Sequence, residues 1–308
     1  MVAVRFTEAN RGPKYIIHAD DYGITLEQSR RILACSSMCG GMGALNSLSV
    51  LVTSPEFCDC ATVLMPFADR LLIGLHVNLV EGPCAADPIE IPLLVNGDGV
   101  FRQSFGGMLA LSTAHPKELR RQLQIEIGAQ LNLFLDAFPE MRGRLRVDSH
   151  QHFHMIPAVF DALATVVEES GCALEYMRIP AEPVAPFAAA HVKSNVPFIN
   201  AVKRVTLNTL WRRNWGKVEG LENHSAVFCG IGFSGCMNEK NVASVLPAFM
   251  EYADDREQRL EFLFHPGGVK DSSACLNPDL PGFVSFYSSA NRDEEANALK
   301  WLQGCQMV

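Results

Sequence analysis

The sequence predicts an α/β fold, a TIM-like (β/α) barrel with seven strands, and three observations favour it. Short β-prone runs alternate with helical segments along the chain, which is typical of a parallel sheet. Unusual polar residues follow several of these runs, and the carboxyl ends of barrel strands share the face that carries active sites. The glycine-rich fingerprint of a dinucleotide-binding sheet is absent after the first strand.

The first half of the chain reads β-α-β-α-β. A β-prone run at 14–19 precedes a helix at 26–38, for which Thr25 is the expected N-cap and a glycine cluster the end. An apolar strand at 48–52 is followed by Ser54-Pro55-Glu56, which opens a second helix to about residue 65. A third apolar strand occupies 71–79.

The second half continues the alternation. Leucine and isoleucine recur at four-residue spacing through 116–138, which predicts an amphipathic helix, and Gly171 closes the helix predicted at 157–170. The remaining predicted strands are 145–149, 173–178, 225–230 and 259–264, and the remaining predicted helices are 239–253 and 291–302.

We expect a single domain, 1–308, with two insertions. Residues 81–115 scatter proline and glycine through a stretch that is too long for an ordinary connection, so we expect it to lie over a functional site. Residues 181–220 form the second insertion, with a basic, partly helical later half. Its basic residues are interpreted as a solvated helix face or, alternatively, as contacts for an anionic substrate group: Lys203, Arg204, Arg212 and Arg213.

The composition excludes several classes of function. The 308 residues carry a formal net charge of −8, which gives no general affinity for nucleic acid or for anionic membranes. The first 13 residues lack the apolar core of a signal peptide, and no apolar run is long enough to cross a bilayer. The ten cysteines include no CxxC pair and are expected to be reduced thiols. These observations favour a cytoplasmic protein.

A histidine cluster predicts a metal site. His150, His152 and His154 alternate directly after the strand at 145–149, and they face one side if the backbone stays extended. Several imidazoles on one side suit a divalent cation better than a core, although a histidine-rich surface turn is the alternative. The adjacent carboxylates of Asp20 and Asp21 repel each other unless a cation or a proton lies between them, although they could simply cap a turn.

Three further polar residues lie at predicted strand ends. His76 lies in an apolar strand, Arg178 ends another, and His265 precedes Pro-Gly-Gly after the last strand. Each has a structural alternative: a core histidine, a carboxylate-pairing arginine and a turn residue. The other histidines, at 115, 191 and 224, are expected at the surface.

The predicted site suits metal-assisted hydrolysis. Mixed carboxylate and imidazole ligands favour Zn²⁺ or another first-row ion, whereas a site for Mg²⁺ alone is more usually all oxygen. Three protein ligands leave room for a water whose pKa the cation lowers, and a neighbouring carboxylate can act as its general base.

Five segments in this order resemble the YdjC-like carbohydrate deacetylase family, which includes chitooligosaccharide deacetylases. They are HADDYGIT (18–25), GLHVNLVEG (74–82), DSHQHFHMIP (148–157), MRIPAEP (177–183) and FHPGG (264–268). The resemblance implies a (β/α) barrel related to that of the polysaccharide deacetylases and one bound divalent metal ion, Zn²⁺ or Mg²⁺. Homodimers are common in that family, so a dimer is an expected assembly.

The resemblance also implies roles for particular residues. Asp21, His76 and His150 would hold the metal, although spacing alone leaves open which of the three clustered histidines is the ligand. Asp20 would be the general base, His265 would protonate the leaving amine, and Arg178 would orient Asp20 or bind substrate. The remaining histidines would support the ligands or contact the substrate: His18, His152 and His154.

The expected reaction is hydrolysis of the N-acetyl group of an amino sugar or oligosaccharide. Aromatic residues of the insertions could stack on sugar rings or pack the insertions onto the barrel: Phe101, Phe105, Trp211 and Trp215. Another metal-dependent hydrolase, such as an amidohydrolase or phosphoesterase, is the first alternative, and the Asp-Asp pair on the first strand counts against the amidohydrolase. A non-catalytic glycan- or metal-binding protein is the second, although it would need neither Asp20 nor His265.

Overall fold

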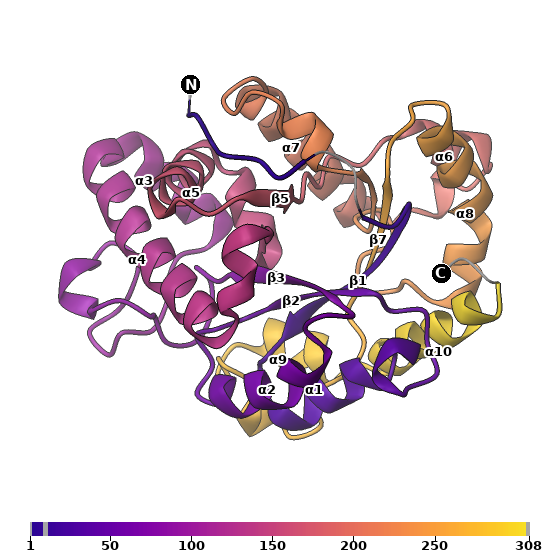
Figure 1. Ribbon diagram of the computed structural model, residues 1–308, viewed down its shortest axis with the longest axis horizontal. Helices are drawn as coiled ribbons and strands as arrows, with labels where there is room; N and C mark the ends of the chain where they lie inside the picture. Colours follow the sequence, from indigo (N-terminus) through magenta and orange to yellow (C-terminus); the bar gives the residue numbers. More distant parts are fainter. Residues whose placement is uncertain (1, 9–11, 306–308) are drawn as a thin grey trace.

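A parallel sheet of seven strands forms the centre of the computed structural model, which describes residues 2–8 and 12–305 (Figure 1). The strand order is β5-β4-β3-β2-β1-β7-β6, and every neighbouring pair is parallel. The strands are β1 (Tyr15–Tyr22), β2 (Ser47–Val50), β3 (Leu72–Val77), β4 (Leu145–Ser149), β5 (Leu174–Met177), β6 (Val227–Cys229) and β7 (Leu260–Phe264). The seven strands and their parallel alternation with helices are as predicted.

The prediction of a closed barrel is wrong, because the sheet is open between β5 and β6. In the described part of the chain no ladder joins these strands. β6 has only three residues, and the outer edge of β5 bonds to the N-terminal segment instead. The amide of Leu174 donates to the carbonyl of Arg5 at 2.8 Å, and the amide of Thr7 donates to the carbonyl of Leu174 at 3.1 Å. The result is a half-barrel whose free edge is partly covered by residues 5–7.

Helices surround the sheet, with α4 and α5 beside one another on one flank and α8 on the other (Figure 1). Their bounds are α1 (Leu26–Leu33), α2 (Phe57–Leu64), α3 (Phe105–Ala114), α4 (Pro116–Ala137), α5 (Pro157–Ser170), α6 (Ala185–Ala189), α7 (Phe198–Asn214), α8 (Glu239–Asp254), α9 (Pro281–Tyr287) and α10 (Asn291–Gly304). Among the described residues, none of these helices has the length and apolar character needed to span a bilayer.

The differences from the expected elements lie mainly at ends and insertions. Helix α1 ends at Leu33 rather than near residue 38, and a 3₁₀ turn follows it. The first insertion contains α3 and the second contains α6 and α7, while α9 was not predicted. His224 is buried rather than at the surface, because its ring stacks on Phe6 and faces the carbonyl of Glu175 at 3.2 Å.

The strands are buried on both faces, as expected for a parallel sheet covered by helices. Large apolar side chains of the helices pack on the outer face, among them Phe134, Phe160 and Phe249. All ten cysteines are free thiols, as predicted. The polar residues at the carboxyl ends of the strands therefore stand out, because they are buried and lie together.

Candidate functional site

A bulge in β1 places two adjacent carboxylates on one cavity. Successive side chains of a regular strand point to opposite faces. Here the pairing of β1 with β2 shifts register between Ala19 and Tyr22, and Asp21 takes a positive φ of 65°. A bulge of this kind redirects a side chain, and both Asp20 and Asp21 line the same cavity. Neither residue is more than 3% exposed.

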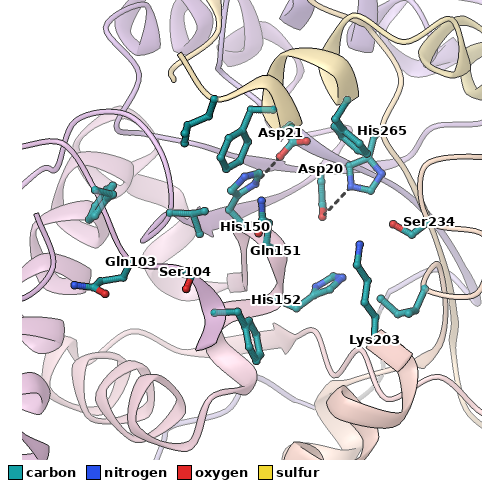
Figure 2. Close-up of a pocket in the computed structure, with 18 of the residues that line it drawn as sticks. Asp20, Asp21, Gln103, Ser104, His150, Gln151, His152, Lys203, Ser234 and His265 are labelled. Carbon is teal, nitrogen blue, oxygen red and sulfur yellow. Dashed lines mark hydrogen bonds and ion pairs between the residues drawn. The ribbon is translucent and has the colours of Figure 1, made fainter. Parts of the chain in front are cut away.

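The cavity has a volume of about 870 Å³, which is within the usual range for a small-molecule site. Its floor is formed at the strand ends, and both insertions and α9 form its walls. Figure 2 shows His150 directed at Asp21 and His265 directed at Asp20, while His152 and Lys203 approach from the opposite wall. The lining also includes aromatic residues from the first insertion and from the segment around α9: Phe101, Phe105, Phe283, Phe286 and Tyr287.

Asp21, His76 and His150 form a group that we call the Asp21 cluster. Each offers one ligand atom, and these atoms lie within 4.8 Å of one another, so the group could hold a metal ion. Asp21 Oδ1 lies 3.4 Å from His76 Nε2 and 2.9 Å from His150 Nδ1. The residues that the family resemblance implies as ligands are therefore brought together from β1, β3 and the turn after β4.

The orientation of His76 fits a metal ligand. His76 is the register partner of Asp148 on β4, so its Nδ1 lies 2.5 Å from Asp148 Oδ1, and the Ser49 hydroxyl lies 2.9 Å from the same nitrogen. Its Nε2 faces Asp21 and is buried without a hydrogen-bond partner among the described residues. A histidine that gives one ring N–H to a carboxylate presents the other nitrogen as a lone pair, as metal-binding histidines do.

The pKa shifts reflect carboxylates gathered around imidazoles. Burial favours the neutral rings, but the charges of Asp20 and Asp148 outweigh it and raise the pKa of His76 to about 9. Burial is likewise outweighed at His150, whose pKa the Asp21 carboxylate raises to about 10. Burial would raise the pKa of Asp21, yet His150 and His76 hold it far below its usual value. Without a metal, protons on the rings therefore balance the carboxylate charge.

His18, Asp20 and Asp148 form a second group, which we call the Arg178 cluster because the guanidinium of Arg178 lies against it. These three residues also offer ligand atoms within 4.8 Å of one another. Here, however, Arg178 Nη1 lies 2.8 Å from Asp20 Oδ1 and Arg178 Nη2 lies 2.9 Å from Asp148 Oδ2. The position that a cation would occupy already carries a positive charge.

Arg178 is completely buried, and Glu261 binds the side of its guanidinium that faces away from Asp20 and Asp148. Its Nε donates to Glu261 Oε1 at 2.7 Å, and the Tyr176 hydroxyl donates to the other oxygen of Glu261. Burial alone would raise the pKa of Asp20, but Arg178 and then His76 hold it well below its usual range. Asp20 is therefore an ionised carboxylate with a fixed orientation at the cavity floor.

His265 lies across the cavity floor from the Asp21 cluster. Its Nε2 is 3.9 Å from Asp20 Oδ2, and its Nδ1 is buried without a hydrogen-bond partner among the described residues. Its backbone amide donates to Glu295 Oε2 at 2.5 Å, which ties the turn after β7 to α10. Burial lowers the pKa of His265, so its ring is neutral at neutral pH.

The remaining predicted histidines have different surroundings. The chain after β4 is a 3₁₀ turn in which Gln151 and His152 have φ values of 50° and 58°. The backbone is therefore not extended, and the prediction that the three clustered histidines face one side is wrong. His152 lines the cavity and packs against Phe228. His154 is enclosed between the Ser149 hydroxyl at 2.6 Å and the carbonyl of Arg178 at 2.9 Å. His18 lies between two serine hydroxyls of β2, outside the cavity lining.

The insertions contribute unequally to the cavity. Phe101 and Phe105 line it, whereas Trp211 and Trp215 pack against each other and lie outside the lining. Of the basic residues on α7, Lys203 lines the cavity and Arg204 is buried.

Four buried residues received no role from the sequence: Glu81, Asp148, Glu261 and Tyr287. Glu81 and Asp148 stand in two of the segments that resemble the deacetylase family, so their positions were signals that could have been followed. Glu261 is a lone acid in an apolar strand, which is a weaker signal. Nothing local in the sequence marks Tyr287, because it reaches the site from α9.

Several known proteins are similar to part of this chain. A carbohydrate deacetylase of Danio rerio is 28% identical over 55% of this chain and 50% of its own length. One from Xenopus laevis is 29% identical over 55% of this chain and 51% of its own. A chitooligosaccharide deacetylase of Escherichia fergusonii is 29% identical over 53% and 59%. The matched stretch thus spans about half the length of these curated relatives.

The fold also has a solved counterpart. A crystal structure from Enterococcus faecalis, of a protein whose proposed role is cellobiose-phosphate cleavage, superposes with a TM-score of 0.57. The match covers 94% of this chain and 95% of that one at 17% identity, so it supports the fold alone. The model of one family, described as YdjC-like protein, matches residues 14–302. The chain belongs to the YdjC-like protein family.

Proposed function

We propose that this protein is a metal-dependent carbohydrate deacetylase that hydrolyses the N-acetyl group of an amino sugar or oligosaccharide. One observation carries the proposal: a metal-competent cluster and an oriented carboxylate base share one cavity floor. Asp21 belongs to the first and Asp20 to the second. The deacetylase relatives support the choice of an acetylated carbohydrate as substrate.

The Asp21 cluster would hold one divalent ion, with Zn²⁺ favoured by its two imidazoles and Mg²⁺ the alternative. When bound, the cation would supply Lewis-acid activation of a water molecule and of the acetyl carbonyl. His76 and Asp21 would fix its place, because Asp148 already holds the His76 ring in orientation.

Asp20 acts as the general base in this proposal. Arg178 keeps it ionised and directed at the cavity, so it can accept a proton from the attacking water. The attack opens the acetyl carbonyl to a tetrahedral intermediate, and collapse of that intermediate breaks the bond between carbonyl carbon and nitrogen.

His265 acts as the proton donor to the leaving nitrogen. Its ring is neutral in the resting protein, so it has to receive a proton before it can give one. Asp20 Oδ2 lies 3.9 Å from His265 Nε2 and would hold the proton taken from water, which it can pass to this ring. The proton removed from water thus returns to the amine, and the products are acetate and the free amino sugar.

The cavity suits a sugar ring. Carbohydrate faces pack on aromatic rings, and Phe101, Phe283 and Phe286 line the walls above the strand ends. His152 is the polar residue on the opposite wall that we assign to substrate contact, because it lines the cavity and is only partly buried.

The test is acetate release from N-acetylated glucosamine oligomers by the metal-free protein supplied with Zn²⁺, Co²⁺ or Mg²⁺. We expect release that depends on added metal and disappears in Asp21→Ala and His150→Ala. Metal-independent release, or turnover only of phosphoesters, would contradict the proposal and favour another hydrolase. Metal binding without turnover of any acetylated glycan would favour a binding protein.

A further inference from the structure

Glu81 is a completely buried glutamate that the proposed reaction does not use. It follows β3 by four residues, and its backbone is fixed by Asn78, whose side chain accepts the amide of Glu81 at 3.2 Å and donates to its carbonyl at 2.5 Å. The carboxylate therefore cannot reach solvent without rearrangement of this turn. A buried carboxylate needs a partner that donates hydrogen bonds or carries positive charge.

The partners of Glu81 are His150 and Tyr287. Glu81 Oε1 lies 3.0 Å from His150 Nε2 and accepts the hydroxyl of Tyr287. Its other oxygen, Oε2, has no hydrogen-bond partner among the described residues. Both contacts are formed by completely or almost completely buried groups, so they are shielded from competition by water.

Each histidine of the Asp21 cluster lies between Asp21 and a second carboxylate. His76 turns Nε2 toward Asp21 and gives its other nitrogen to Asp148 at 2.5 Å. His150 turns Nδ1 toward Asp21 at 2.9 Å, and its Nε2 lies 3.0 Å from Glu81 Oε1 in an ion-pair contact that lacks hydrogen-bond geometry. Carboxylates in this place fix the ring and strengthen the facing nitrogen as a metal ligand. Asp148 is, however, shared with Arg178, whereas among the described residues Glu81 pairs with no basic side chain other than His150.

We propose that Glu81 is a positioning residue that holds His150 for the metal, and that Tyr287 holds Glu81. The inference rests on the proposed function only in that a metal binds to the Asp21 cluster. It assigns the segment around α9 a part in metal binding, although none of its residues is a ligand.

The attachment of this segment supports the assignment. Val269 N donates to the carbonyl of Tyr287 at 3.0 Å, and Gly82 N donates to Asn277 Oδ1 at 2.9 Å. The turn that carries Glu81 and the segment that carries Tyr287 are thus bonded to each other beside the cluster. Phe283 also stacks near the His150 ring, with centroids 6.4 Å apart.

The experiment measures metal affinity rather than activity. Metal-free wild-type protein and its variants are titrated with Zn²⁺ by calorimetry and with Co²⁺ by visible absorption. We expect Glu81→Gln to weaken binding by about 10–100-fold, the usual cost of losing a partner of a metal-bound histidine, and Tyr287→Phe to weaken it less. The double variant should lose little more than Glu81→Gln, because both changes act through one contact.

Glu126→Gln is the matched control. Glu126 is also completely buried, and it accepts the amides of Ala85 and Ala86 in the chain just after Glu81, but it does not touch His150. We expect this variant to keep wild-type metal affinity even where its thermal stability falls. Wild-type affinity in Glu81→Gln, or an equal loss in Glu126→Gln, would overturn the inference.

Two outcomes separate this inference from the proposed function. Wild-type protein that binds metal but releases no acetate would refute the deacetylase function. The role of Glu81 would still be tested by the metal affinities of wild-type protein and Glu81→Gln. Wild-type protein that binds none of the metals would refute both. If Glu81→Gln does not fold, Tyr287→Phe decides: weaker metal binding supports the inference, and wild-type affinity contradicts it.

Discussion

The Asp21 cluster and the Arg178 cluster are near neighbours made from the same residue types, yet they balance their charge differently. Each brings together carboxylate and imidazole atoms within 4.8 Å. In the Arg178 cluster a guanidinium lies 2.8 Å from Asp20 and 2.9 Å from Asp148. In the Asp21 cluster the positive charge is on His76 and His150, whose pKa values are raised to about 9 and about 10.

A fixed cation and exchangeable protons suit different tasks. Arg178 cannot be deprotonated in a protein, so it permanently occupies the place of a metal and keeps Asp20 ionised. Protons on imidazole rings can leave when a metal ion takes their place. In our proposal Asp21 therefore binds the metal and Asp20 is the base, although the two residues are adjacent in sequence.

The largest expected effect is loss of the metal in Asp21→Asn. This change removes a ligand charge from the Asp21 cluster, so we expect metal affinity to fall by more than the roughly 10–100-fold that an outer partner contributes. Acetate release should fall with it. Calorimetric titration with Zn²⁺ measures the affinity, and binding close to that of the wild type would show that Asp21 is not a ligand.

Asp20→Asn is the complementary change. We expect metal affinity within a few-fold of wild type, because Arg178 rather than the metal lies against this carboxylate. Acetate release should fall by about 10²–10⁴-fold, the usual contribution of a general base. Measurement of kcat at saturating metal tests this, and full activity would remove Asp20 from the proposed reaction.

Arg178→Met would leave the carboxylates of the Arg178 cluster without their cation. Removing one partner of a buried ion pair costs about 3–5 kcal/mol, so we expect a loss of that order in the free energy of unfolding, measured with urea. Activity should fall as well, because Asp20 loses its orientation and its low pKa. Arg146→Met is the control: Arg146 is buried and pairs with Glu175 at 2.8 Å, so its loss should cost stability without the same loss of activity.

The last prediction concerns pH, which changes the affinity of the Asp21 cluster for metal without any substitution. Protonation of His76 and His150 stabilises the metal-free fold below the unfolded pKa of 6.5, and this contribution is lost as pH rises through about 9 and 10. A metal has to displace these protons, so affinity should rise with pH by up to about tenfold per unit for each proton lost. Titrations in buffers of different ionisation enthalpy count the protons. Proton-free binding between pH 6 and pH 8 would contradict the charge balance described for the Asp21 cluster.

Much of the site could be predicted from sequence because strand ends are local features. The β-prone runs that contain or precede Asp20, His76, Asp148 and His265 place all four residues at one edge of a parallel sheet, whether the sheet is open or closed into a barrel. Closure itself depends on what bonds to the edge of β5. Residues 5–7 do so from the other end of the chain, and no pattern in the β5 sequence indicates it.

The conformations that separate the two clusters could not be predicted. The bulge at Asp21 depends on the pairing of β1 with β2, and the left-handed turn at Gln151 and His152 on the packing after β4. The period-two pattern therefore gave a wrong prediction that the side chains of His150, His152 and His154 face one side. The contact of Tyr287 with Glu81 joins residues 206 apart in sequence, so only the folded chain reveals it.

The most direct test of these assignments is the position of the metal. Crystals grown with Zn²⁺ and measured at the zinc absorption edge would locate it by anomalous scattering. We predict one peak at the cavity floor, bonded to Asp21, His76 and His150, with Arg178 still paired to Asp20 and Asp148. A peak among His18, Asp20 and Asp148, with Arg178 displaced, would contradict the account.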